Sequence, residues 1–79
     1  MTEYDIAIEV DALGSFCPGP MMQLIKAIRQ AEVGEYLALL SSDEGTRNDV
    51  PAWLNKAQHE LVEIINLDGY DKYIVKKLH

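Results

Sequence analysis

The chain has 79 residues, of which 48% are hydrophobic, and its 13 acidic and 7 basic side chains give a formal net charge of −6. This length and composition predict one globular domain over residues 1–79, too small for two lobes that enclose a deep cleft. The negative charge repels phosphate backbones and anionic lipid, so neither nucleic acid nor a membrane is expected as a direct partner.

The N-terminal segment and the cysteine content predict where the protein resides. MTEYDIAIEV is acidic and alternates in polarity, unlike a secretion signal, and no apolar run reaches membrane-spanning length. We therefore expect a cytoplasmic protein, monomeric in isolation, whose single cysteine, Cys17, stays reduced. One cysteine and two separated histidines form no metal-binding cluster, so neither a metal nor another cofactor is expected.

The first half of the chain predicts a strand, a turn and a helix. Tyr4–Val10 alternates apolar and polar side chains, which is the period of a half-buried strand. Gly14 suits a turn with positive φ, and Pro18 suits the first position of a helix, where its missing N–H costs nothing. From Pro20 to about Ala31 apolar residues recur at three- and four-residue steps, which predicts an amphipathic helix.

The middle of the chain predicts a buried strand, a polar loop and a second helix. Tyr36–Leu40 is apolar enough for a buried strand, and Ser41–Asp49 is rich in turn and capping residues. A helix should then run from Asp49 or Val50 to about His59. Its start has two readings, since Asp49 could be the cap or could belong to a capping box with Thr46.

The last two predicted elements are strands over Leu61–Leu67 and Tyr70–Leu78, joined by the hairpin signal Asp68-Gly69. The resulting order, βαβαββ, predicts an α+β fold. We expect a two-layer sandwich in which two helices cover one face of a four-stranded mixed sheet. The other face should meet solvent, in keeping with the charged residues of the late strands, Glu63, Lys72, Lys76 and Lys77.

The predicted position of Cys17 is compatible with a reactive thiolate and also with a buried structural cysteine. At a helix N-terminus the helix dipole and unpaired N–H groups favour a thiolate over a thiol. The alternative is a small buried core residue, because free cysteine is often buried. Phe16 next to it is expected to anchor in the core or to staple the helix, although it could instead shield the sulfur or contact a partner.

Several kinds of cysteine chemistry are disfavoured. His59 is expected to be a cation at a helix end rather than a catalytic base, and His79 is the last residue, so hydrolysis by this chain alone is not expected. Pro20 stands where a thioredoxin-like motif would have its second cysteine. What remains is a single thiolate that accepts a group, holds it and hands it to another protein.

Other side chains near Cys17 have structural explanations as well as functional ones. Met21 fits the core face of the first helix, whereas Met22 could form a soft contact patch. The basic residues of that helix, Lys26 and Arg29, point off its apolar face, where they are solvated or meet an acidic partner. Asp43 and Asp49 are expected to be turn and cap residues rather than participants in sulfur transfer.

These motifs resemble the TusA/SirA-like sulfur-carrier proteins over nearly the whole chain. The resemblance is carried, in order, by Asp11-Ala12-Leu13-Gly14, Cys17-Pro18-Gly19-Pro20, Lys26, Gly34-Glu35, Asp43, Asp49-Val50-Pro51, Trp53 and His59-Glu60-Leu61. It implies the same βαβαββ sandwich, and a persulfide carried on Cys17. Pro18 and Pro20 match the motif prolines, Gly14 and Phe16 flank the motif, and Asp43 and Asp49 match recurrent loop acids.

The implied partners are sulfur-transfer proteins: a cysteine desulfurase or a rhodanese as donor, and a further carrier, such as a DsrE-like protein, as acceptor. The pathway stays open between transfer RNA thiolation, cofactor synthesis and dissimilatory sulfur metabolism. The chain departs from the family pattern at Phe16, Glu44 and Gln58, which border the expected docking surface. The alternatives are a non-catalytic interaction domain with a structural cysteine, and a subunit of a thiol-dependent reductase or isomerase.

Overall fold

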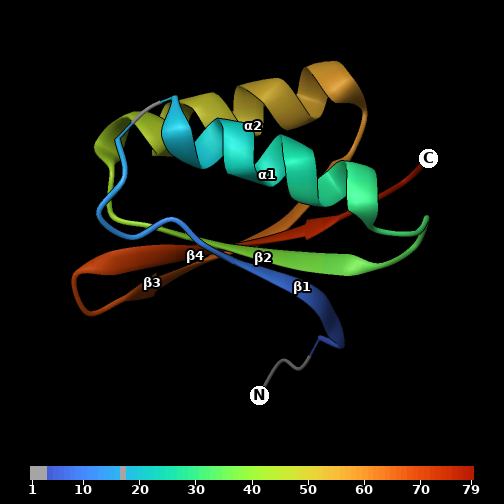
Figure 1. Ribbon diagram of the computed structural model, residues 1–79, viewed down its shortest axis with the longest axis horizontal. Coiled ribbons are helices and arrows are strands. Elements are labelled where there is room, and N and C mark those ends of the chain that lie inside the picture. Colours follow the sequence, from blue (N-terminus) through green and yellow to red (C-terminus); the bar gives the residue numbers. More distant parts are fainter. Residues whose placement is uncertain (1–3, 17) are drawn as a thin grey trace.

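The computed structural model describes residues 4–16 and 18–79 (Figure 1). The elements are β1 (Ile6–Asp11), α1 (Gly19–Gln30), β2 (Tyr36–Ser41), α2 (Glu44–Ala57), β3 (Glu60–Leu67) and β4 (Tyr70–Lys76). The strands form one sheet in the order β1-β2-β4-β3. β1 and β2 are parallel, and the other pairs are antiparallel. The predicted α+β fold with a mixed sheet is therefore confirmed.

Both helices lie on the same face of the sheet (Figure 1). Parallel strands need a crossover connection, and α1 supplies it between β1 and β2. The two helices begin at the same end of the sheet, where β1 and β2 also end (Figure 1). This end therefore gathers the loop before α1 and the loop before α2.

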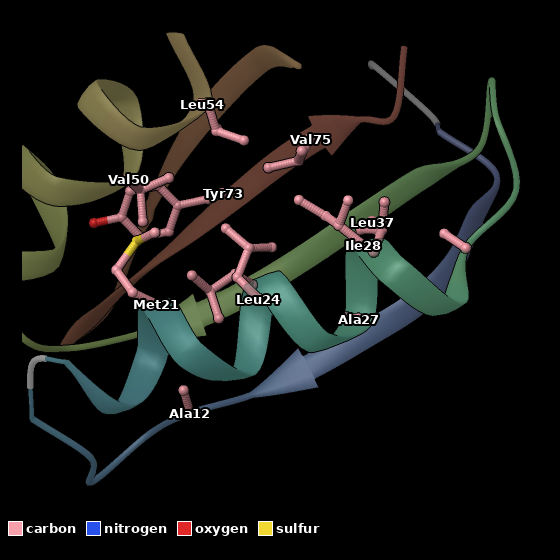
Figure 2. Close-up of a cluster of buried hydrophobic side chains, with 12 residues drawn as sticks. Ala12, Met21, Leu24, Ala27, Ile28, Leu37, Val50, Leu54, Tyr73 and Val75 are labelled. Carbon is pink, nitrogen blue, oxygen red and sulfur yellow. The ribbon is translucent and has the colours of Figure 1, made fainter. Parts of the chain in front are cut away.

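The core lies between the helices and the sheet. α1 contributes the buried residues Met21, Leu24, Ala27 and Ile28 at helical spacing, which confirms Met21 as a core residue. Figure 2 shows Met21 converging with Val50 of α2 and Tyr73 of β4 in one cluster. Fully burying a side chain such as Leu24 stabilises the fold by about 1.5–3 kcal/mol. This packing fixes α1 on the sheet and thereby positions the loop before it.

The opposite face of the sheet carries the predicted charges, with one exception. Alternation along β4 places Lys72 and Lys76 on the face away from the core residue Tyr73. The Tyr4 hydroxyl donates a 3.0 Å hydrogen bond to a Glu63 carboxylate oxygen on that face. Lys77 differs from the prediction, because its Nζ donates to the carbonyl oxygen of Ala31, 2.8 Å away, at the C-terminal end of α1. Its charge stabilises that helix end.

The start of the second helix was predicted too late. The predicted loop over Ser41–Asp49 contains the first turns of α2, which begins at Glu44 with Asp43 as N-cap residue. Asp49 is an interior residue of the helix, and so is Pro51, which was expected at its start. The last turn ends at Gln58, whose φ of 64° is left-handed. The predicted hairpin turn is confirmed by Gly69, with a φ of 87° between β3 and β4.

Neither helix within residues 4–16 and 18–79 combines the length and the apolar character that a membrane crossing requires.

Candidate functional site

The loop from β1 to α1 is held in place by its own backbone. The N–H of Ala12 donates to the carbonyl oxygen of Leu40 at 2.9 Å, which extends the pairing with β2 by one residue. The N–H of Ser15 then donates to the carbonyl oxygen of Ala12 at 3.1 Å, across a turn in which Gly14 has a φ of 84°. The predicted role of Gly14 is therefore confirmed: it turns the chain toward the start of α1.

Cys17 itself lies outside the described residues, so its exposure and ionisation stay predictions. Backbone hydrogen bonds connect the residues on either side of it. The N–H of Gly19 donates to the carbonyl oxygen of Phe16 at 2.8 Å, and the N–H of Met22 donates to the carbonyl oxygen of Pro18 at 3.0 Å. The chain thus turns between Phe16 and Gly19 and enters α1 directly.

The two motif prolines lie at the start of α1, on either side of Gly19. Pro18 is the N-cap residue, one position earlier than predicted, and Pro20 is the second helical residue. The first N–H groups of a helix have no partner within it, so the missing N–H of Pro20 removes no helical hydrogen bond, as predicted. Pro20 is fully buried and fixes this turn in the core.

The start of α1 is electrostatically positive. Its first turn has no acidic residue, and proline has no side-chain oxygen with which Pro18 could cap the N–H groups. The positive end of the helix dipole is therefore not offset by a carboxylate of the first turn. An anion next to this turn is stabilised, which is the condition that lowers a cysteine pKa.

Phe16 does not anchor in the core. Its residue is 78% exposed, so the prediction of a core or staple role was wrong. A hydrophobic staple pairs the residue before the N-cap with the fourth helical residue. With Pro18 as N-cap, Phe16 lies one residue too early, and the fourth helical residue, Met22, is itself 62% exposed. Both apolar side chains face outward near Cys17 in the sequence.

A groove of about 330 Å³ separates the start of α1 from the middle of α2. Pro18, the residue after Cys17, lies at the α1 side of the groove. Asp49 and the only tryptophan, Trp53, line the α2 side. The complete lining is Pro18, Met21, Ile25, Asp49, Ala52, Trp53 and Lys56. The groove thus has a mostly apolar lining and reaches Pro18 of the cysteine motif.

The two motif acids have different positions. Asp43 is the N-cap residue of α2, as predicted, although its side chain makes no capping hydrogen bond within the described part of the chain; its carboxylate accepts a hydrogen bond from the Thr46 hydroxyl at 3.3 Å. Asp49 is not a cap or turn residue, because it lies inside α2 and lines the groove opposite Pro18. The structure therefore brings Pro18 and Asp49 to one groove and assigns Asp43 to the start of α2.

The sequence model of the family described as Sulfurtransferase TusA matches residues 8–77. The chain belongs to the TusA family.

Relatives agree with this membership. Two proteins of Archaeoglobus fulgidus, each named "Putative sulfur carrier protein", are 52% and 38% identical to the chain. The first comparison covers 90% of this chain and 97% of the relative, and the second covers 86% and 90%. The crystal structure of a SirA-like protein from Desulfitobacterium hafniense has the same fold, with a TM-score of 0.80 at 23% identity. That comparison covers 91% of this chain and 99% of the other.

His59 of this TusA-family chain does not serve as a helix-end cation. Its Nδ1 accepts a hydrogen bond from the backbone N–H of Leu78 at 3.2 Å, and its ring stacks on His79 with 4.6 Å between centroids. Burial lowers the pKa of His59, and the nearby His79 and Lys77 lower it further. The neutral form is therefore favoured. His59 follows the C-terminal end of α2, whereas the TusA motif lies where the helices begin.

No group of three or more metal-binding side chains occurs within residues 4–16 and 18–79.

The sequence did not predict one feature near the cysteine motif of this TusA-family chain. The pattern indicated that Trp53 belongs to the second helix, but it did not indicate that Trp53 and Lys56 face Pro18 across a groove. The relevant signal was the Asp49-Val50-Pro51 segment with Trp53. The sequence predicts a helix start at this segment, whereas its position in the middle of α2 places Asp49 and Trp53 at the groove beside α1.

Proposed function

We propose that the chain is a sulfur carrier that accepts sulfane sulfur as a persulfide on Cys17 and relays it to partner proteins. The observation that carries this proposal is the family match over residues 8–77, which includes the Cys-Pro-Gly-Pro motif. The whole of residues 1–79 serves as one carrier domain, and the reaction takes place in the cytoplasm. Catalysis resides mainly in the donor and acceptor proteins.

Loading is a thiol exchange in which no external oxidant takes part. The Cys17 thiolate attacks the outer sulfur of a donor persulfide, and a new S–S bond forms at Cys17. The S–S bond of the donor breaks, and the donor cysteine leaves as a thiolate. A cysteine desulfurase or a rhodanese supplies such a persulfide. The positive start of α1 supports this step, because a thiolate is the attacking species.

Unloading repeats the same exchange in the other direction. The thiolate of an acceptor, such as a DsrE-like carrier, attacks the outer sulfur, and Cys17 leaves as a thiolate. A low pKa makes Cys17 a good leaving group, so the same helix start supports both steps. The acceptor then feeds transfer RNA thiolation, cofactor synthesis or dissimilatory sulfur metabolism.

Mass spectrometry after incubation with a cysteine desulfurase and cysteine tests this function. We expect a gain of one sulfur atom on the native chain, removable by a reductant, and no gain on Cys17→Ser. Alkylation of the native thiol by iodoacetamide should also be faster than that of a free cysteine at pH 7. Absence of the adduct together with slow alkylation would instead favour the non-catalytic interaction domain.

A further inference from the structure

The exposed side of α1 differs in charge from the rest of the molecule. Residues 12–31 contain two basic side chains, Lys26 and Arg29, and no acidic one. The remainder of the chain holds all 13 acidic residues and the other 5 basic ones. An acidic protein thus carries one basic helix, directly after its cysteine motif.

The two basic side chains of α1 form no ion pair with the described part of the chain. Lys26 and Arg29 are exposed, and neither forms an ion pair with any residue in 4–16 or 18–79. Other basic residues have partners of their own. Arg47 binds Asp71 at 2.6 Å, and Lys77 donates to Ala31. The charges of α1 are therefore available to another molecule.

Apolar side chains adjoin these charges. Met22, Lys26 and Arg29 are spaced by four and three residues, which places them in one stripe along the helix. They line a shallow hollow of about 600 Å³ with Gln23, Ile25 and Gln30. Phe16 lies in the loop at the N-terminal end of the same helix and is 78% exposed. We name Phe16, Met22, Lys26 and Arg29 the apolar–basic surface.

We propose that the apolar–basic surface docks a sulfur-transfer protein that presents acidic side chains around an apolar pocket. The inference rests on the proposed function, since the docked protein must bring its own cysteine to Cys17. Phe16 and Met22 fill the pocket, and Lys26 and Arg29 pair with its acidic rim. The rest of the carrier is acidic and repels such a rim, so attraction at α1 and repulsion elsewhere orient the encounter.

A protein fits this surface better than a nucleic acid. The two exposed cations give few phosphate contacts, and the net charge of −6 opposes binding to a polyanion. Exposed apolar side chains rimmed by polar ones mark protein contacts. Transfer RNA is the competing ligand and is tested directly below.

The test compares loading of charge-reversed chains by a protein donor. The donor is a cysteine desulfurase with acidic residues around its persulfide cysteine, supplied with cysteine. In the double variant Lys26→Glu and Arg29→Glu, we expect the rate of sulfur gain on Cys17 to fall roughly tenfold or more at low salt. The deficit should shrink as salt rises, because exposed charges are screened.

Matched variants separate an effect on docking from the effect of a changed net charge or of a lost exposed apolar side chain. Lys72→Glu with Lys76→Glu makes the same charge change on the opposite face of the sheet, and its loading rate should stay near that of the native chain. Phe16→Ser should slow loading, whereas Val33→Ser, at a residue that is 64% exposed beyond the other end of α1, should not. Circular dichroism confirms that each variant is folded.

Each outcome of these experiments either supports or overturns docking at α1. Slower loading with unchanged alkylation of Cys17 by neutral iodoacetamide supports docking at α1. Normal loading of the Lys26/Arg29 variant overturns docking there and leaves the carrier function intact, and an equal slowing of alkylation also overturns it. A native chain that gains no sulfur overturns the carrier function and this inference together. Transfer RNA binding that is lost in the Lys26/Arg29 variant would show that the surface binds nucleic acid instead.

Discussion

The two helices begin at the same end of the sheet, but their first turns are built differently. α2 starts inside a network that joins its first turns to side chains of β2, β4 and its N-cap residue. The Ser41 hydroxyl donates to the Thr46 hydroxyl at 3.3 Å, which in turn donates to the Asp43 carboxylate, and Ser41 and Thr46 are fully buried. Arg47 in the next position binds Asp71 of β4.

α1 starts on proline and has no acid in its first turn, whereas α2 has Asp43 as its N-cap residue and Glu44 in its first turn. Apolar side chains next to the start of α1 face outward rather than into the core. Side chains thus tie the start of α2 into the fold, whereas no carboxylate of its own first turn offsets the positive end of α1. The start of α1 is the arrangement that suits the proposed thiolate at Cys17.

The largest effect on stability should come from breaking the start of α2. Thr46→Val keeps the shape of a fully buried side chain but removes both hydroxyl interactions. We expect a loss of about 1–3 kcal/mol in the free energy of unfolding, measured by urea titration with Trp53 fluorescence. Met22→Ala, on the exposed side of α1, should change it by less than about 0.5 kcal/mol. Equal losses would contradict the difference between the two helix starts.

An intermediate effect should follow from giving α1 the negative charge that its start lacks. In Pro18→Asp a carboxylate adjoins Cys17 and raises the pKa of its thiol, so alkylation by iodoacetamide at pH 7 should slow by about threefold to tenfold. Pro18→Asn has nearly the same shape without the charge and is the control. Equal rates in the two variants would mean that the sulfur does not ionise at this helix start.

The smallest effect on stability should come from lowering the pH, through protonation of His59 after the C-terminal end of α2. The pKa of His59 is lowered from 6.5, chiefly by burial and then by His79 and Lys77, so the folded chain favours the neutral imidazole. Below pH 6.5 the unfolded chain binds more protons, and the contribution of His59 to stability is lost as the pH falls toward its folded pKa. His59→Phe should flatten this dependence in urea titrations between pH 7 and 5. If the slope persists in this variant, another group is responsible.

Strands and helices with a regular pattern could be predicted from sequence, because their apolar residues recur at the period of the strand or the helix. Alternation in β1 and β4, the apolar face of α1 and the Asp68-Gly69 turn each have a local signal. The start of α2 has no such signal. Thr46 is polar yet fully buried, because its hydroxyl is satisfied by Ser41 and Asp43, and this compensation exists only in the folded structure.

The candidate site could be predicted only in part, because only some of its residues have a local sequence signal. The motif around Cys17 is contiguous, so its place before a helix follows from Pro18 and Pro20. The position of Asp49 opposite Pro18 depends on how two helices pack, which no local pattern encodes. Phe16 was misjudged because its direction depends on which residue is the N-cap, and a shift of one position reverses the expected packing.

The central place of β4 has a consequence for synthesis of the chain on the ribosome. β4 is made after the other three strands of this sheet, yet it lies between β2 and β3 and buries Tyr73, Ile74 and Val75 almost completely. Until residues 70–76 emerge from the ribosome, β2 and β3 lack the strand that joins them. The nascent chain therefore exposes the edges of β2 and β3 that later pair with β4. Cys17 is translated before all of these strands except β1, and the sheet that supports its helix is completed only when β4 has been made.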